Sequence, residues 1–117
     1  MAAAAGAAKR AGGEVIGILM GDDPADANPD CTHVVATGIG QARNLAVVAS
    51  GDAVIALGGE GGTLSEIAFA RRLGRTVVTL DSWSVTGRGA MQTPPGIELA
   101  SDPADAVRLA LAAAQRR

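Results

Sequence analysis

The sequence predicts an α/β fold in which an open parallel sheet carries helices on both faces. Short apolar runs rich in Val and Ile recur along the chain, and stretches with helical spacing of apolar residues separate them. This alternation is typical of parallel sheets, because parallel strands need a crossover connection. A glycine-rich segment follows the central apolar run, where a strand of such a sheet would end and ligands bind.

An Ala-rich helix and two short strands are expected in the first part of the chain. The helix covers residues 2–11 and ends at Gly12 and Gly13, since glycine readily takes the left-handed conformation of a C-cap. Apolar runs predict strands over residues 14–20 and 33–36.

The acidic loop between these strands, residues 21–30, has a weak likeness to a calcium loop. Three residues have the spacing of the first EF-hand ligands: Asp26, Asn28 and Asp30. Cys31 stands where that loop needs Gly, and Cys31 and His33 have no zinc-binding partners at the usual spacing. We therefore expect a solvated loop and no metal site.

A turn at residues 37–40 leads into a helix over residues 41–50, which Gly51 is expected to cap. The residues expected to face the sheet are Leu45, Val48 and Ala49. Five apolar residues then predict a strand over 53–57 that is buried on both faces.

The central strand runs directly into a glycine-rich loop and a further helix. The helix is indicated by the spacing of Ile67, Ala68, Ala70 and Leu73. Glycines let the backbone approach a ligand, and a helix start adds partial positive charge, so the loop suits phosphate. The loop is not a P-loop, because Thr63 follows Gly62 directly and the required Lys is missing. It is not a dinucleotide fingerprint either, and the nearest approach to that pattern, residues 38–43, has Arg43 in place of the third Gly.

Thr63 and Glu66 have two compatible interpretations. Thr-x-x-Glu at a helix start is a capping box, in which each side chain satisfies a backbone N–H group. A carboxylate at the third helical position beside a phosphate loop is also placed for acid–base catalysis. Glu60 disfavours tight phosphate binding unless it is paired or turned to a ribose hydroxyl.

The last part of the chain predicts one more strand and one more helix. The strand covers residues 76–80, and a loop over 81–96 contains Trp83 and Arg88. Ser101 or Asp102, followed by Pro103, starts the helix. Its expected packing face consists of Ala106, Val107, Ala110 and Leu111.

Composition limits the functions to consider. At 117 residues the chain is expected to be one domain, residues 1–117. One Phe, one Trp, no Tyr and a net charge of −2 argue against nucleic-acid binding, which favours basic and aromatic surfaces. The single Cys fits a reducing cytoplasm, and no apolar run approaches a membrane-spanning length.

The segments around Arg43 and residues 58–66 resemble the LOG family, long labelled lysine decarboxylase-like, within the wider SLOG group. That family's signature is PGGxGTxxE, with an Arg-Lys pair one helix earlier. The matching positions are Arg43, Gly62, Thr63 and Glu66, whereas Gly58, Glu60 and Asn44 depart from it. With these departures the chain is similar to the SLOG branch that contains molybdenum-cofactor carrier proteins.

The resemblance implies a Rossmann-like open parallel sheet that lacks the family's usual N-terminal βαβ unit. It also implies binding of a nucleotide-like or pterin-like phosphate ligand, either the molybdenum cofactor or an AMP-like nucleotide. The implied ligand-binding residues are Gly58, Gly59, Gly61, Gly62, Thr63, Arg43 and Asn44, with Glu60 as a further candidate.

Two other functions stay open under this resemblance. The first is a phosphoribohydrolase acting on a cytokinin riboside monophosphate, in which Glu66 would stabilise the oxocarbenium-like centre or activate water and Arg43 would hold the phosphate. The second is a regulatory domain without a ligand. The family also forms dimers through helices, so we expect a homodimer or higher homo-oligomer that covers apolar faces near Leu45, Ile67 and Phe69.

Overall fold

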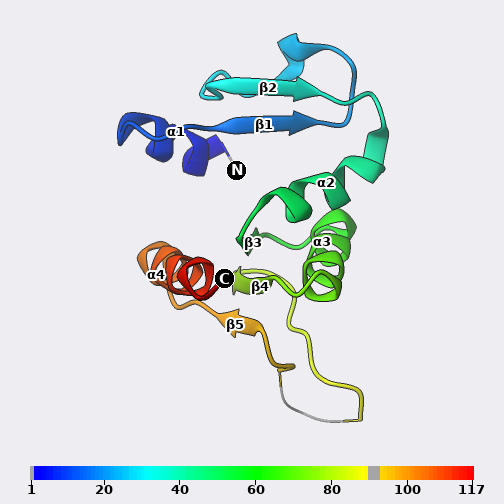
Figure 1. Cartoon of the computed structure of the whole chain (residues 1–117), viewed down its shortest axis with the longest axis vertical. Coiled ribbons are helices and arrows are strands. Elements are labelled where there is room, and N and C mark those ends of the chain that lie inside the picture. Colours follow the sequence, from blue (N-terminus) through cyan, green and yellow to red (C-terminus); the bar gives the residue numbers. More distant parts are fainter. Residues whose placement is uncertain (1, 90–92) are drawn as a thin grey trace. The chain divides into compact units, whose positions relative to one another are not determined.

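The computed structural model describes residues 2–89 and 93–117. Figure 1 shows its elements, whose bounds follow the chain: α1 (Ala2–Arg10), β1 (Ile16–Leu19), η1 (Pro24–Asp26), β2 (His33–Ala36), η2 (Gly40–Ala42), α2 (Arg43–Ser50), β3 (Ala53–Leu57), α3 (Gly61–Arg72), β4 (Thr76–Leu80), β5 (Ile97–Leu99) and α4 (Pro103–Arg116). The chain divides into two compact units, Met1–Arg43 and Asn44–Arg117. All strand pairs in the described residues are parallel, which confirms the predicted fold class.

The first unit contains a two-stranded sheet. β1 and β2 pair in parallel, from Ile16 opposite His33 to Leu19 opposite Ala36. β1 is shorter than the predicted strand over 14–20, and β2 has the predicted bounds. The helix before them ends as predicted: Gly12 has a φ of 83°, and Gly13 N–H donates to the Ala8 carbonyl at 2.9 Å.

The second unit contains the order β3-β4-β5, all parallel. Val77 and Val78 are adjacent in β4 and therefore point to opposite faces, yet both are fully buried. Helices thus cover both faces of this sheet, and Figure 1 shows α3 and α4 on opposite sides of β4. β5 was not predicted from the sequence, because a three-residue strand that reads Ile-Glu-Leu is too short to show periodicity.

The core of the second unit lies between α2, α3 and the sheet. Its buried cluster consists of Val48, Ala56, Ile67, Ala70, Val77 and Ile97. On the other face, α4 buries Ala106 and Ala113. These contacts fix the carboxyl ends of β3 and β4, where the candidate loop begins.

Two predicted helix faces are wrong in part, although Val48 in α2 and Ala106 in α4 are buried as expected. Leu45 and Ala49 in α2 are exposed, as are Val107 and Leu111 in α4. In helices this rich in Ala, apolar residues lie on more than one side, so spacing alone does not identify the side that meets the sheet. The expected association face is also wrong in part, because Ile67 is buried in the core and Phe69 packs against it.

The end of α2 differs from the prediction that Gly51 caps it. Gly51 does not have a positive φ. Instead the Arg75 guanidinium, at the start of β4, donates from Nε to the Gly51 carbonyl (2.8 Å) and from Nη2 to the Ala49 carbonyl (3.3 Å). A side chain from a distant position therefore satisfies the last carbonyls of this helix.

α4 begins as predicted. Asp102 is its N-cap, and the Asp102 carboxylate accepts from Asp105 N–H at 2.7 Å, with Pro103 as the first helical residue. The backbone N–H of Ser101 and then the Arg108 side chain donate to the Asp105 carboxylate and lower its pKa. Among the described residues, no helix has both the length and the apolar character needed to cross a membrane.

Candidate functional site

The loop after β3 is open on the side where a side chain would project. Gly58 has a φ of 76°, which favours glycine at that position. Gly59 and Gly61 do not have a positive φ, and a Cβ at either would meet no atom within 4 Å. Neither backbone conformation nor packing within the described structure therefore requires glycine at 59 or 61. Their lack of side chains leaves the loop backbone open to approach.

The helix after this loop begins earlier than predicted. α3 starts at Gly61 with Glu60 as its N-cap, and Glu60 makes no side-chain capping hydrogen bond. Thr63 is therefore the third helical residue and Glu66 the sixth, so the prediction of a capping box that starts at Thr63 is wrong. The first N–H groups of any helix have no carbonyl partner within the helix. Here no N-cap side chain takes one of them, which leaves donors for an anion.

Trp83 holds the loop from the segment that follows β4. Its indole Nε1–H donates to the Glu60 carbonyl at 3.0 Å, and Leu64 N–H donates to the same carbonyl at 3.2 Å. The sequence placed Trp83 in the loop over residues 81–96 but did not indicate a role for it. An indole N–H usually finds an acceptor in a folded protein, so Trp83 could have been expected to hydrogen-bond to a nearby segment. This contact helps to explain why α3 begins at Gly61, since it fixes the N-cap residue.

Asn44 braces the first turns of α3. Asn44 is only 3% exposed, and its Nδ2 contacts Ser65 Oγ at 3.5 Å. Ser65 Oγ in turn donates to the Gly62 carbonyl at 2.8 Å. Ser65 was not predicted as a site residue. Thr63 and Glu66 are both half-buried on the same helix.

Arg43 is the last residue of the first unit, whereas the loop belongs to the second. The Arg43 Nη1–H donates to the Ile18 carbonyl of β1 at 2.7 Å. The Nε atom is buried and has no hydrogen-bond partner among the described residues. A guanidinium has five N–H donors, so the contact with Ile18 leaves donors that suit an anion.

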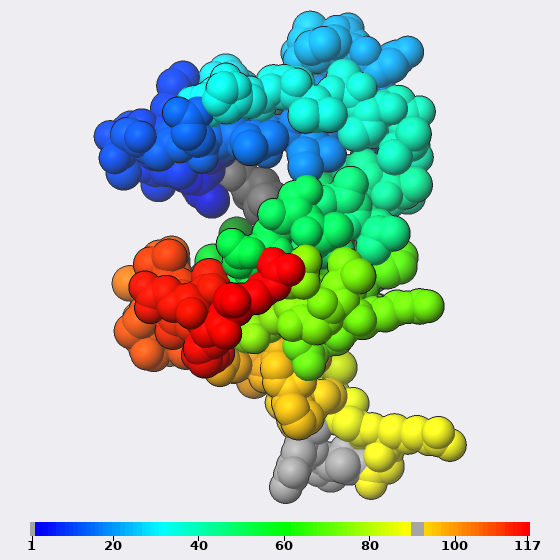
Figure 2. Space-filling view, viewed as in Figure 1, coloured from blue at the N-terminus to red at the C-terminus, as the bar shows by residue number. Residues whose placement is uncertain are grey.

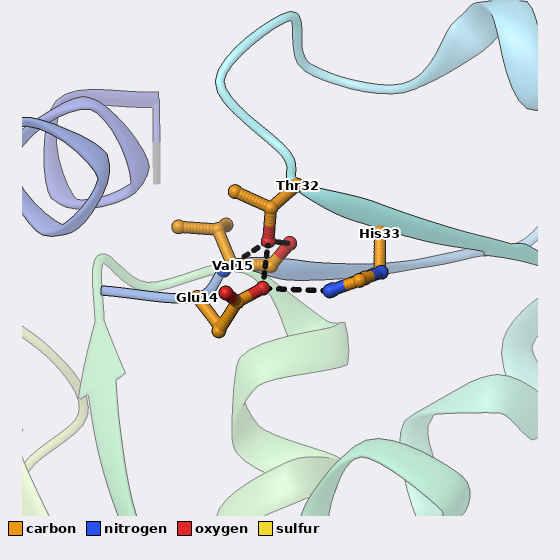
Figure 3. Close-up of polar contacts among 4 residues, drawn as sticks. All are labelled: Glu14, Val15, Thr32 and His33. Atoms are coloured by element: carbon orange, nitrogen blue, oxygen red, sulfur yellow. Dashed lines mark hydrogen bonds and ion pairs between the residues drawn. The ribbon is translucent and has the colours of Figure 1, made fainter. Parts of the chain in front are cut away.

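A polar cluster that the sequence did not predict links the amino ends of β1 and β2 (Figure 3). Thr32 Oγ1 accepts from Val15 N–H at 2.8 Å and donates to Glu14 Oε2 at 3.0 Å. His33 Nε2 lies 2.6 Å from the same Glu14 oxygen. The hydrogen bond from Thr32, followed by the interactions with His33, lowers the pKa of Glu14. The cluster is exposed, and its geometry ties two strands together.

The acidic loop of the first unit satisfies its own backbone. Asp23 Oδ1 accepts from Ala25 N–H, and Asn28 Oδ1 accepts from Asp30 N–H, each at 2.9 Å. In the part of the chain that the structure describes, no group of three or more His, Cys, Asp or Glu side chains is placed to hold a metal ion.

Comparisons with known proteins agree on the family and the fold. The model of the SLOG cluster4 family matches residues 1–107. An uncharacterised protein of Archaeoglobus fulgidus is 42% identical over 85 residues, which cover 68% of this chain and 52% of that protein. The chain thus spans about half the length of this curated relative.

A solved structure gives the fold comparison. The molybdenum cofactor binding protein from the phototrophic bacterium Rippkaea orientalis superposes with a TM-score of 0.77 at 29% identity, covering 93% of this chain and 68% of that one. The likeness confirms the predicted Rossmann-like α/β fold. Because the family model covers most of its length, the chain belongs to the SLOG cluster4 family.

Proposed function

We propose that this protein binds a small phosphorylated ligand of nucleotide or pterin type, with the phosphate on the loop formed by residues 58–63. The observation that carries the proposal is the open backbone at Gly59 and Gly61, where the described structure requires no glycine. The first N–H groups of α3 lie next to it without a capping side chain. Backbone donors and the positive end of a helix together favour a phosphate.

The similar solved protein supports a pterin-type ligand. It is named as a molybdenum cofactor binding protein and is 29% identical to this chain. The molybdenum cofactor carries a phosphate on a pterin, so its phosphate suits the loop donors. On this proposal Gly58, Gly59, Gly61, Gly62 and Thr63 hold the phosphate, and the cofactor is a cargo that the protein binds unchanged.

Arg43 and Asn44 have separate roles in the proposal. Arg43 stays a predicted phosphate ligand on the basis of its sequence spacing to the loop, since a guanidinium can form paired hydrogen bonds with a phosphate. Asn44 is almost completely buried and contacts Ser65 at the start of α3. On this proposal Asn44 therefore supports the position of the loop.

Glu60 limits the affinity. Its side chain is exposed at the N-cap and makes no capping hydrogen bond. A carboxylate beside a phosphate repels it, so Glu60→Gln should tighten phosphate binding by a few-fold at low salt, on the order of 1 kcal/mol or less. The effect should shrink as salt is added.

The test compares two glycines that each have room for a side chain. Gly59 and Gly21 both lack a positive φ, and a Cβ at either would meet no atom within 4 Å. Gly59→Asp places a negative charge in the proposed site, whereas Gly21→Asp makes the same change in the first unit. Calorimetric titration with AMP and with a phosphorylated pterin should show at least about tenfold weaker binding for Gly59→Asp alone. Equal binding by Gly59→Asp and wild type would refute the phosphate loop.

The same samples distinguish a carrier from a hydrolase. A carrier should release no adenine when it is incubated with AMP. Adenine release by wild type that is lost in Glu66→Gln would instead assign the loop to a phosphoribohydrolase. Binding of AMP by Glu66→Gln at wild-type strength provides the control for folding.

A further inference from the structure

An apolar groove runs along α3 from its first turn. One wall consists of Leu64, Ala68 and Arg71, and the other of Val85, Pro94 and Pro95. Figure 2 shows the segment after β4, in yellow, beside the segment that leads into β5, in gold. The volume of the groove is about 380 Å³. Ligand pockets usually measure about 300 to 1,000 Å³ and have apolar walls with few polar groups.

Among the described residues that line this groove, Arg71 alone carries a charge. Arg71 Nη1 donates to the Arg75 carbonyl at 2.6 Å. Its guanidinium also lies against Gly96, where a Cβ would overlap it, and Gly96 has a φ of 84°. These contacts hold the planar cation in place. Since a guanidinium has five donors, the single bond to Arg75 leaves donors for a ligand.

The groove begins directly after the phosphate loop. Leu64 is the fourth residue of α3, and its N–H bonds to the carbonyl of the N-cap Glu60. From Leu64 to Arg71 the helix rises by about 10 Å, at roughly 1.5 Å per residue. One small molecule can therefore reach from the loop into the groove.

We propose that this groove binds the planar ring of the phosphorylated ligand, and that the ring is an oxo-substituted heteroaromatic such as a pterin or guanine. The inference rests on the proposed function, since it assigns the second half of the same ligand. Flat apolar walls suit a ring, and a guanidinium stacks on rings and donates hydrogen bonds. Because Arg71 can only donate, a ring edge with two neighbouring acceptors, such as the O6 and N7 edge of guanine, fits better than the matching edge of adenine, where an amino group replaces the carbonyl.

The experiment compares ligands that share a phosphate and differ in the ring. Calorimetric titration with GMP, AMP and ribose 5-phosphate measures the contribution of the ring. Ala68→Leu fills the groove from an exposed helix position, and Ala104→Leu makes the same change at an exposed position of α4. GMP should bind more tightly than AMP, and AMP more tightly than ribose 5-phosphate. Ala68→Leu should weaken GMP about tenfold or more without changing ribose 5-phosphate, and Ala104→Leu should change neither.

The outcomes separate this inference from the proposed function. If GMP, AMP and ribose 5-phosphate bind wild type equally, the groove assignment fails while the phosphate loop stands. If no phosphorylated ligand binds, guanosine and a pterin without phosphate decide the groove alone. Shifts of the Leu64 and Ala68 amide signals with either compound would then support the groove, and their absence would overturn it.

Discussion

The two units of this protein contain similar apolar strands but bury them to different extents. In the second unit Val77 and Val78 of β4 are fully buried, with a helix on each face of the sheet. In the first unit Ile16 of β1 is 61% exposed and Val35 of β2 is 49% exposed. Among the described residues of the first unit, Gly6 alone is buried.

The difference shows that an apolar run becomes a core strand only when helices of the same unit cover it. A two-stranded sheet is at best marginally stable in water, whereas three strands packed against helices form a core. The proposed phosphate loop is therefore rooted in the stable unit, where β3 and α3 position both of its ends. The exposed strands of the first unit need cover from elsewhere.

The largest expected difference between the two units comes from truncating one Ile in each of them. Ile67→Ala removes a side chain that is 2% exposed and should lower the free energy of unfolding by about 2 to 5 kcal/mol. Ile16→Ala removes one that is 61% exposed and should cost less than about 0.5 kcal/mol. Urea denaturation of both variants at low concentration measures the two values. Equal costs would contradict the difference in burial.

Arg75 tests whether distant side chains stabilise the second unit. Arg75→Ala removes the donors to the Gly51 and Ala49 carbonyls and should lower the free energy of unfolding by about 2 kcal/mol. Arg72→Ala, at an exposed position on α3, serves as the control and should cost under about 0.5 kcal/mol. A result in which both variants match wild type would mean that Arg75 does not cap α2.

Self-association is the expected way to cover the first unit. Val35 and Val107 are matched in exposure, at 49% and 51%, and lie in different units. Sedimentation at micromolar concentration should give a mass above that of the monomer for wild type. Val35→Lys should shift the protein toward monomer, because association would bury the charged Lys at a large desolvation cost. Val107→Lys should leave the mass unchanged, because the expected interface covers the first unit and leaves position 107 exposed. A monomeric wild type would remove the basis for this prediction.

The smallest expected effect is a pH dependence of local stability at Glu14. Its folded pKa lies below the ordinary value of 4.5, mainly because Thr32 donates to the carboxylate. Its stabilising contribution is therefore present above the unfolded pKa and is lost as the pH falls through the folded pKa. Hydrogen exchange at the Val15 amide, which donates to Thr32 Oγ1, should quicken relative to intrinsic rates as the pH falls through the folded pKa of Glu14 in wild type. Glu14→Gln should largely remove this pH dependence.

Local signals predicted much of the fold. β2, β3 and β4 have the bounds that apolar runs and flanking glycines indicated, and α4 starts at the predicted Asp102-Pro103 pair. These features depend on residues that are adjacent in sequence. The sheet-facing sides of α2 and α4 were predictable only in part: Val48 and Ala106 are buried as expected, but both helices are apolar on more than one side.

The candidate site was predictable only in part. The position of the glycine loop after β3 followed from composition and spacing. The start of α3 did not, because Thr63 and Glu66 form a plausible local cap whereas the observed N-cap is held by Trp83, 23 residues away. The bracing of α3 by Asn44 is also a contact between distant positions. Arg43, Glu66 and the loop glycines remain predictions as ligand-binding or catalytic residues.

The central claim is that the loop after β3 binds phosphate, and amide NMR tests it most directly. Titration of the labelled protein with AMP, and separately with inorganic phosphate, should shift the backbone amide signals of Gly59, Gly61, Gly62 and Thr63 with a common dissociation constant. The amides of the acidic loop at residues 21–30 should change far less, because this loop belongs to the first unit and supplies no residue to the proposed site. Saturating AMP that leaves these four signals unmoved would contradict the claim.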